Sequence, residues 1–171
     1  MSVESMINTA EEYRHASQKK SNAHYKMSES ANSRHTKLGV PAAILSTLVG
    51  TAIFSTINAP SASVSVRIIA GLLSLVAAVL VSLQTFFNYS DQASKHRDAA
   101  ASYEAVRHKL DWFILANSKL SNESDLEKPL AVLLDISTSM DEIRRTAPAI
   151  PDSIYDAAQT KVASRPLLGK S

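Results

Sequence analysis

The 171-residue chain contains no cysteine, only four glycines and a single tryptophan. The lack of cysteine excludes disulfides, thiolate catalysis and cysteine-ligated metal sites. Four widely scattered glycines cannot build a loop that cradles a phosphate group. A formal net charge of +2 is too small to indicate a nucleic-acid-binding protein, and we expect no nucleic-acid partner.

Charge is also missing from one long internal stretch. Residues 38–90 contain a single charged side chain, that of Arg67, whereas charged residues crowd the sequence on both sides. Two apolar segments lie within this stretch, near residues 39–58 and 68–88, with a polar turn around Pro60 between them. Each segment is long enough for a helix to cross a hydrocarbon core of roughly 30 Å. The pattern predicts a two-helix transmembrane hairpin.

The alternative is a buried hairpin inside a soluble helical protein. Two helices that are apolar on every face need a large surrounding core to cover them. The rest of the chain is mostly polar or alanine and cannot supply that core. The sequence therefore favours a membrane protein and predicts the lipid bilayer as its partner.

Basic residues indicate how the hairpin is oriented. They flank it on its two outer sides, whereas the loop between the spans offers only Arg67. The flanking residues are Arg14, Lys19, Lys20, Lys26, Arg34 and Lys37 before the hairpin, and Lys95, Arg97, Arg107 and Lys109 after it. By the positive-inside rule we expect a multi-pass protein of the inner membrane with both termini in the cytosol. Phe86, Phe87 and Tyr89 close the second span as an aromatic anchor.

The polar segments beside the hairpin are also predicted to be helical, which makes the fold all-α. An N-terminal helix is expected because residues 3–37 lack glycine and proline, and Pro41 is placed in the first turn of the next helix. The second span is expected to continue without a break to residue 117. Further helices are predicted over residues 128–145 and from Asp152.

We assign residues 1–165 to a single domain. It comprises a cytosolic N-terminal helix over residues 1–37, the two-span hairpin over residues 38–90 and cytosolic helices over residues 91–165. Residues 166–171 form a tail.

No group of residues indicates catalysis, and we expect no enzyme activity, cofactor or metal. His96, Arg97 and Asp98 copy a protein-kinase tripeptide, but neither the glycine loop nor the magnesium ligands accompany it. The five histidines are not spaced as metal ligands. We expect them to contact polar neighbours in a helical bundle.

Polar side chains inside the spans fall at helical spacing and make one stripe on each. The first stripe is Thr47, Thr51, Ser55 and Asn58, and the second is Ser74, Ser82 and Thr85, with Ala70 and Ala78. One interpretation is helix packing, in which small residues allow close approach and hydroxyls bond across. The other is the lining of a hydrated pore in an assembly of several copies. The sequence alone favours packing, and the two are compatible. No charged residue lies deep in either span, which disfavours proton relay and coupled transport.

Residues after the hairpin carry a family resemblance. Small, histidine and tyrosine side chains recur there at helical spacing, and a Pro-x-x-Pro segment followed by tyrosine lies near the C-terminus. These residues are Ala93, His96, Ala99, Ala100 and Tyr103, then Pro148, Pro151 and Tyr155. In this order around a double span they resemble the SLATT family, two-transmembrane effector domains associated with prokaryotic conflict systems.

The resemblance implies a homo-oligomeric pore-forming effector of antiviral defence. Such a domain is switched on by a separate sensor that makes or binds a nucleotide signal, and then permeabilises the inner membrane and causes dormancy or cell death. One face of the helix after the hairpin is our candidate for contacts between copies or with a partner, namely His96, Ala100, Tyr103, Val106, Arg107 and Leu110. The rival hypothesis is a non-conducting membrane anchor or adaptor that recruits a cytosolic partner.

Overall fold

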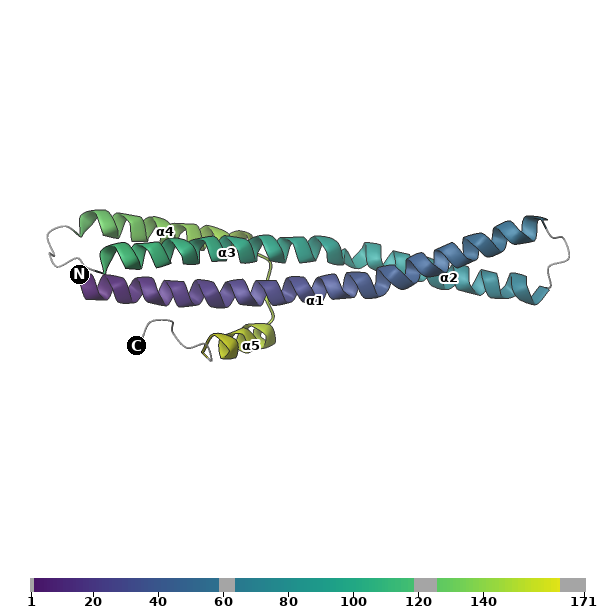
Figure 1. Ribbon diagram of the computed structural model, residues 1–171, viewed down its shortest axis with the longest axis horizontal. Coiled ribbons are helices and arrows are strands. Elements are labelled where there is room, and N and C mark those ends of the chain that lie inside the picture. Colours follow the sequence, from purple (N-terminus) through teal and green to yellow (C-terminus); the bar gives the residue numbers. More distant parts are fainter. Residues whose placement is uncertain (1, 59–63, 119–125, 164–171) are drawn as a thin grey trace. The chain divides into compact units, whose positions relative to one another are not determined.

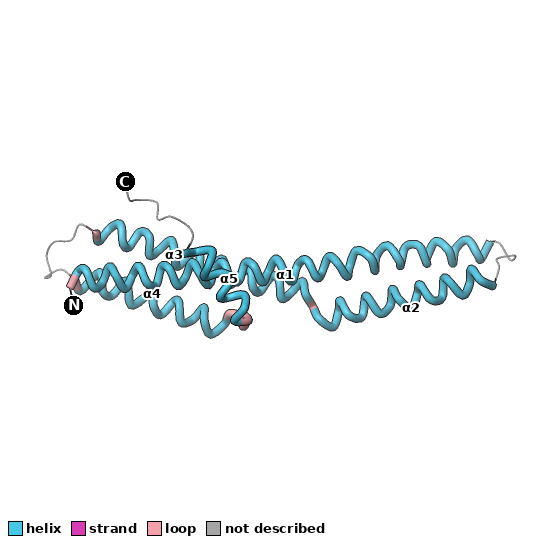
Figure 2. Tube along the Cα trace, turned by 90° about the horizontal axis from the view of Figure 1, so that it is seen from below, coloured by secondary structure: helices cyan, strands magenta, loops and turns pink. Residues whose placement is uncertain are grey.

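The computed structural model describes residues 2–58, 64–118 and 126–163, and the secondary structure in these ranges is entirely helical (Figure 2). The helices are α1 (Val3–Asn58), α2 (Val64–Phe87), α3 (Tyr89–Asn117), α4 (Glu127–Thr146) and α5 (Asp152–Ala163) (Figure 1). The predicted all-α class is confirmed. The chain divides into two compact units. We call Met1–Ser28 with Ser94–Ser171 the bundle unit and Glu29–Ala93 the hairpin unit.

The bundle unit has an apolar core to which α1, α3 and α4 all contribute. Its buried residues recur at three- and four-residue steps on each helix, so that each presents one apolar face to the other two. They are Met6 and Ala10 of α1, Val106, Leu110 and Phe113 of α3, and Leu133, Ile136 and Met140 of α4. Helix α5 adjoins α1, because Lys19 Nζ lies 4.1 Å from the centroid of the Tyr155 ring.

The hairpin unit has almost no core. Its two helices meet through small residues such as Ala42 and Ala77, which are buried, whereas the large apolar side chains point outward. Phe54 is 74% exposed and Leu75 is 64% exposed. Within the described residues, two helices are long and apolar enough to cross a membrane. The predicted transmembrane hairpin is confirmed, because lipid is the solvent that such a surface requires.

One prediction about the first span is wrong. Pro41 lies inside α1 and not in the first turn of a separate helix, because α1 runs unbroken from Val3 to Asn58. A proline inside a helix has no N–H to offer the carbonyl of residue 37, at a cost of about 3 kcal/mol. Buried residues lie on both sides of Pro41 within the hairpin unit, Ala31 before it and Ala42 and Val49 after it.

The second span is also interrupted where we predicted a continuous helix. Helix α2 ends at Phe87 and α3 begins at Tyr89, with Asn88 between them at a φ of 43°. Asparagine is among the few residues other than glycine that adopt this left-handed conformation readily. The side-chain amide of Gln92 donates to the carbonyl oxygen of Phe87 over 2.8 Å and replaces part of the lost helical bonding.

The C-terminal predictions agree with the structure. Helix α4 extends the predicted range of residues 128–145 by one residue at each end, and α5 begins at Asp152 as expected. The predicted turn around Pro60 and the tail over residues 166–171 lie outside the described residues.

Candidate functional site

The hydroxyl groups of the predicted stripes bond within their own helices. Four of them donate to the carbonyl oxygen four residues earlier, over 2.9 Å for Thr47 and Thr51, 2.8 Å for Ser82 and 3.0 Å for Thr85. A hydroxyl that is satisfied in this way needs no partner from the facing helix. These four hydroxyls can therefore face lipid, another protein chain or water without an unpaired donor.

The same side chains lie away from the contact between the two spans. Thr47, Thr51, Ser74, Ser82 and Thr85 are all exposed, whereas the buried side chains of the hairpin are mostly small apolar ones. Within one chain, the hydroxyl stripes are thus not the packing surface of the hairpin. Ser55 and Asn58, the other two predicted residues, lie outside the side chains that the structure describes.

In the bundle unit, the buried side chains of α1 change from apolar to polar along the helix, while their helical spacing stays the same. Beyond the apolar residues Met6 and Ala10, the same face continues with Ser17, Ser21 and His24, which are 0%, 0% and 3% exposed. Buried polar groups are costly unless they are hydrogen-bonded. This half of the bundle must therefore supply polar partners.

The partners of the two serines come from other helices. Ser17 donates its hydroxyl to the sulfur of Met140 over 3.7 Å, and Ser21 donates to a carboxylate oxygen of Glu104 over 3.1 Å. These bonds join α1 to α4 and to α3.

His24 forms a buried pair with His96 of α3. Their Nδ1 atoms lie 2.9 Å apart, so one neutral ring donates a proton and the other accepts it. The His24 ring also stacks on Tyr103, with 5.7 Å between ring centroids. Burial lowers the pKa of His24 to about 4, with smaller contributions from His96 and Lys20. Burial also lowers the pKa of His96, so both rings are neutral at pH 7.

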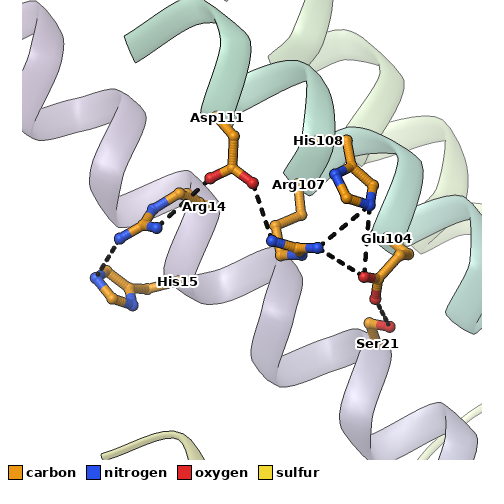
Figure 3. Close-up of polar contacts among 7 residues, drawn as sticks. All are labelled: Arg14, His15, Ser21, Glu104, Arg107, His108 and Asp111. Carbon is orange, nitrogen blue, oxygen red and sulfur yellow. Dashed lines mark hydrogen bonds and ion pairs between the residues drawn. The ribbon is translucent and has the colours of Figure 1, made fainter. Parts of the chain in front are cut away.

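A second polar group joins α1 and α3 (Figure 3). Arg107 donates to Glu104 over 2.7 Å and to Asp111 over 2.9 Å, and Asp111 also accepts a bond of 3.5 Å from Arg14. The hydrogen bond from Arg107 holds the pKa of the Glu104 carboxyl below its usual value. Because Glu104 is also the acceptor for Ser21, one chain of contacts crosses between the two helices.

The candidate oligomer or partner face is therefore covered in this structure. Five of its six members are buried, and Leu110 is 0% exposed. They are His96, Ala100, Tyr103, Val106 and Leu110. The sixth, Arg107, is held in the network with Glu104 and Asp111. In the single chain, this apolar spacing builds contacts within the bundle unit.

An apolar surface remains exposed elsewhere on the bundle unit. A groove of about 560 Å³ lies between α3 and α4, and Trp112 at its wall is 70% exposed. Val132 and Pro129 continue the apolar wall, with Lys109 and Asp135 among the lining residues.

Sequence reasoning did not find the partner of His96. The signal was present, because Ser17, Ser21 and His24 keep the helical spacing of the apolar face that precedes them. A polar residue on the buried side of a helix predicts a polar partner opposite. Among the described residues, no group of three or more histidine, cysteine, aspartate or glutamate side chains could hold a metal ion.

Comparison with known proteins identifies one family. The model of the family described as "SMODS and SLOG-associating 2TM effector domain family 4" matches residues 13–162, which include both spans and the helices α3 and α4. No curated protein and no solved structure matches the chain.

Proposed function

The chain belongs to the SMODS- and SLOG-associating two-transmembrane effector family, which makes it a membrane effector of a prokaryotic conflict system, and we propose that it acts by forming a pore. Several copies assemble through their spans and permeabilise the membrane. The observation that carries the proposal is the exposure of the hydroxyl stripes on spans whose other described exposed side chains are largely apolar.

The stripes suit a hydrated path. Two helices cannot enclose a channel, so a pore of this protein needs several hairpins. Hydroxyls that donate to their own backbone keep the lone pairs of the oxygen available to accept hydrogen bonds from water. Thr47, Thr51 and Ser55, or Ser74, Ser82 and Thr85, line the path in this proposal, with Asn58 at its end. The apolar side chains around them face lipid or the neighbouring hairpin.

The proposal includes the orientation of the hairpin in the membrane and the signal that opens the pore. In this proposal both termini lie in the cytosol and the spans lie in the inner membrane, and the basic residues on the outer sides of the hairpin support that orientation. Residues 1–165 work as one domain, in which the bundle unit receives the signal and the hairpin unit responds. The signal comes from a separate sensor protein or the nucleotide that the sensor makes, and the response ends in dormancy or death of an infected cell.

Reconstitution in liposomes tests pore formation. The full chain is inserted at rising protein-to-lipid ratios, and the release of an encapsulated dye and the oligomer mass in detergent are measured. We expect an oligomer and dye release that rises steeply with protein density. The double variant T47L/T51L inserts equally well but releases dye at least about tenfold more slowly, because leucine removes the hydroxyl path. The control V40L changes a neighbouring exposed side chain of the same span and leaks like the wild type.

The second candidate function is a non-conducting adaptor. The observation that favours it is the exposed groove around Trp112 and Val132, which fits an apolar segment of a cytosolic partner. In that case the wild type remains a monomer without leakage at every protein density. The T47L/T51L variant is then fully active in cells, whereas Trp112→Ser is not.

A further inference from the structure

The hairpin unit contains a cavity whose lining, apart from Thr85, has no part in the pore proposal. Its volume is about 500 Å³, and it opens beside the break between α2 and α3. Most of the side chains around it are polar, although they lie in the unit whose other exposed side chains are largely apolar. The lining includes His35, Gln84, Thr85, Asn88, Tyr89 and Ser90.

Three local features shape this cavity. Gly39 allows α1 to approach Gln84 closely, since an added Cβ would lie 3.1 Å from its amide nitrogen. That amide nitrogen lies 3.3 Å from Nδ1 of His35. With the amide donating to Nδ1, the ring proton is on Nε2, which is left as a donor. Asn88, at a φ of 43°, follows the last residue of α2, and both Asn88 and Ser90 line the cavity.

Positive charge lies at the edge of the cavity. The guanidinium carbon of Arg34 is 6.0 Å from the ring centroid of Tyr89, one of the lining residues. Lys37 follows on the next turn of α1 and is exposed. The carboxylate nearest in sequence is Asp91, which has an interaction of its own. Hydrogen-bond donors with a nearby guanidinium are the groups that recognise a phosphate.

Aromatic side chains indicate the depth of the cavity in the bilayer. Tyr89 stacks on Phe87 with 5.3 Å between ring centroids, and Phe86 beside them is 82% exposed. Phenylalanine at the end of an apolar span, followed by tyrosine, is typical of the level of the lipid headgroups. Polar lining groups at this level meet headgroups before any other ligand.

We propose that this cavity binds the phosphate of an anionic phospholipid headgroup. Basic pockets between transmembrane helices at the membrane surface bind such headgroups in other proteins. Arg34 contacts the phosphate, and His35, Gln84, Asn88 and Ser90 offer the hydrogen bonds. The proposal is independent of pore formation, because a non-conducting hairpin holds the lipid equally well.

Native mass spectrometry of the full chain in a neutral detergent tests the proposal. Short-chain phosphatidylglycerol, short-chain phosphatidylcholine and inorganic phosphate are titrated separately, and the fraction of lipid-bound protein is measured. We expect phosphatidylglycerol to bind at least about tenfold more tightly than phosphatidylcholine, and inorganic phosphate not to displace it. Equal binding of the two lipids overturns the proposal. Displacement by inorganic phosphate also overturns it, in favour of a soluble phosphate ligand.

Two variants and a matched control locate the site. R34Q weakens phosphatidylglycerol binding about fivefold, the usual effect of one basic residue on anionic lipid. S90F fills the cavity without a change of charge and reduces binding at least as much. The control R67Q removes the same charge from the first turn of α2 and leaves binding unchanged. A loss in R67Q equal to that in R34Q overturns the proposal, as does full binding by S90F with unchanged circular dichroism.

Discussion

The hairpin unit and the bundle unit share helix α1 but bury opposite kinds of side chain. In the bundle, large apolar side chains such as Tyr103 and Leu110 are covered. In the hairpin, small residues such as Ala77 are covered, whereas Leu75 points outward. The difference follows from the solvent, because water drives apolar groups together and lipid does not. Helix α1 therefore buries large apolar side chains such as Met6 in the bundle and small ones such as Ala42 in the hairpin.

Polar groups follow the same division. The bundle joins helices through polar contacts, such as the pair His24–His96 and the bonds from Arg107 to Glu104. The hydroxyls of the hairpin, such as that of Thr51, bond to their own helix. A buried polar contact between helices specifies which faces meet. A hydroxyl that bonds to its own backbone does not specify which surface packs against that helix.

The largest effect is expected from truncation in the bundle core. Leu110→Ala should lower the free energy of unfolding by about 2–5 kcal/mol, because it opens a cavity among tightly packed side chains. The matched variant Leu134→Ala changes an exposed leucine of α4 and should cost under about 0.5 kcal/mol. Chemical unfolding in detergent, followed by circular dichroism, measures both. Similar costs for the two variants would contradict the assigned core.

A charged side chain should be costly on the lipid-facing hairpin and tolerated on the water-facing bundle. Leu75→Arg lies in the middle of α2 and should make insertion less favourable by about 3–4 kcal/mol. The control Ala105→Arg adds the same side chain at an exposed position of α3, where water hydrates it. The fraction that resists alkaline extraction from membranes is the measurement. If Leu75→Arg resists extraction as well as the wild type does, this part of α2 does not lie in the bilayer.

Acid should destabilise the bundle through its histidine pair. The pKa of His24 is about 4 in the folded protein, below its ordinary 6.5, so the unfolded chain binds the proton more tightly. The stabilisation is complete above pH 6.5 and is lost as the pH falls toward 4, by about 2–3 kcal/mol. Unfolding at pH 7 and pH 4.5 is compared with that of H24L/H96L. If both proteins lose equal stability, the pair is not responsible.

The smallest effect concerns the ion-pair network. Arg107→Gln should lower stability by about 1 kcal/mol, because Arg107 is still partly exposed and water screens its contacts. Arg97→Gln removes the same charge from an exposed position of α3 and should have almost no effect. The denaturation midpoints of the two variants at low and high salt give the measurement. A loss that salt does not reduce would contradict an electrostatic origin.

The two spans and most helix boundaries could be predicted from the sequence. Hydropathy over 20 residues and the spacing of apolar side chains are local properties, and they located α4 to within one residue at each end. Local rules failed at Pro41 and Asn88. Proline was expected to start a helix, and the absence of glycine and proline was taken to mean an unbroken one. In the structure Pro41 lies inside α1, and Asn88 separates α2 from α3.

The sequence by itself determined that the chain has two lipid-facing helices and apolar faces on the helices around them. Only the tertiary structure decided what each face meets. The face containing Tyr103 and Leu110 contacts its own chain, and His24 lies against His96 although 72 positions separate them. The physical reason is that periodicity records which side of a helix avoids water, whereas the partner on that side depends on how the helices pack.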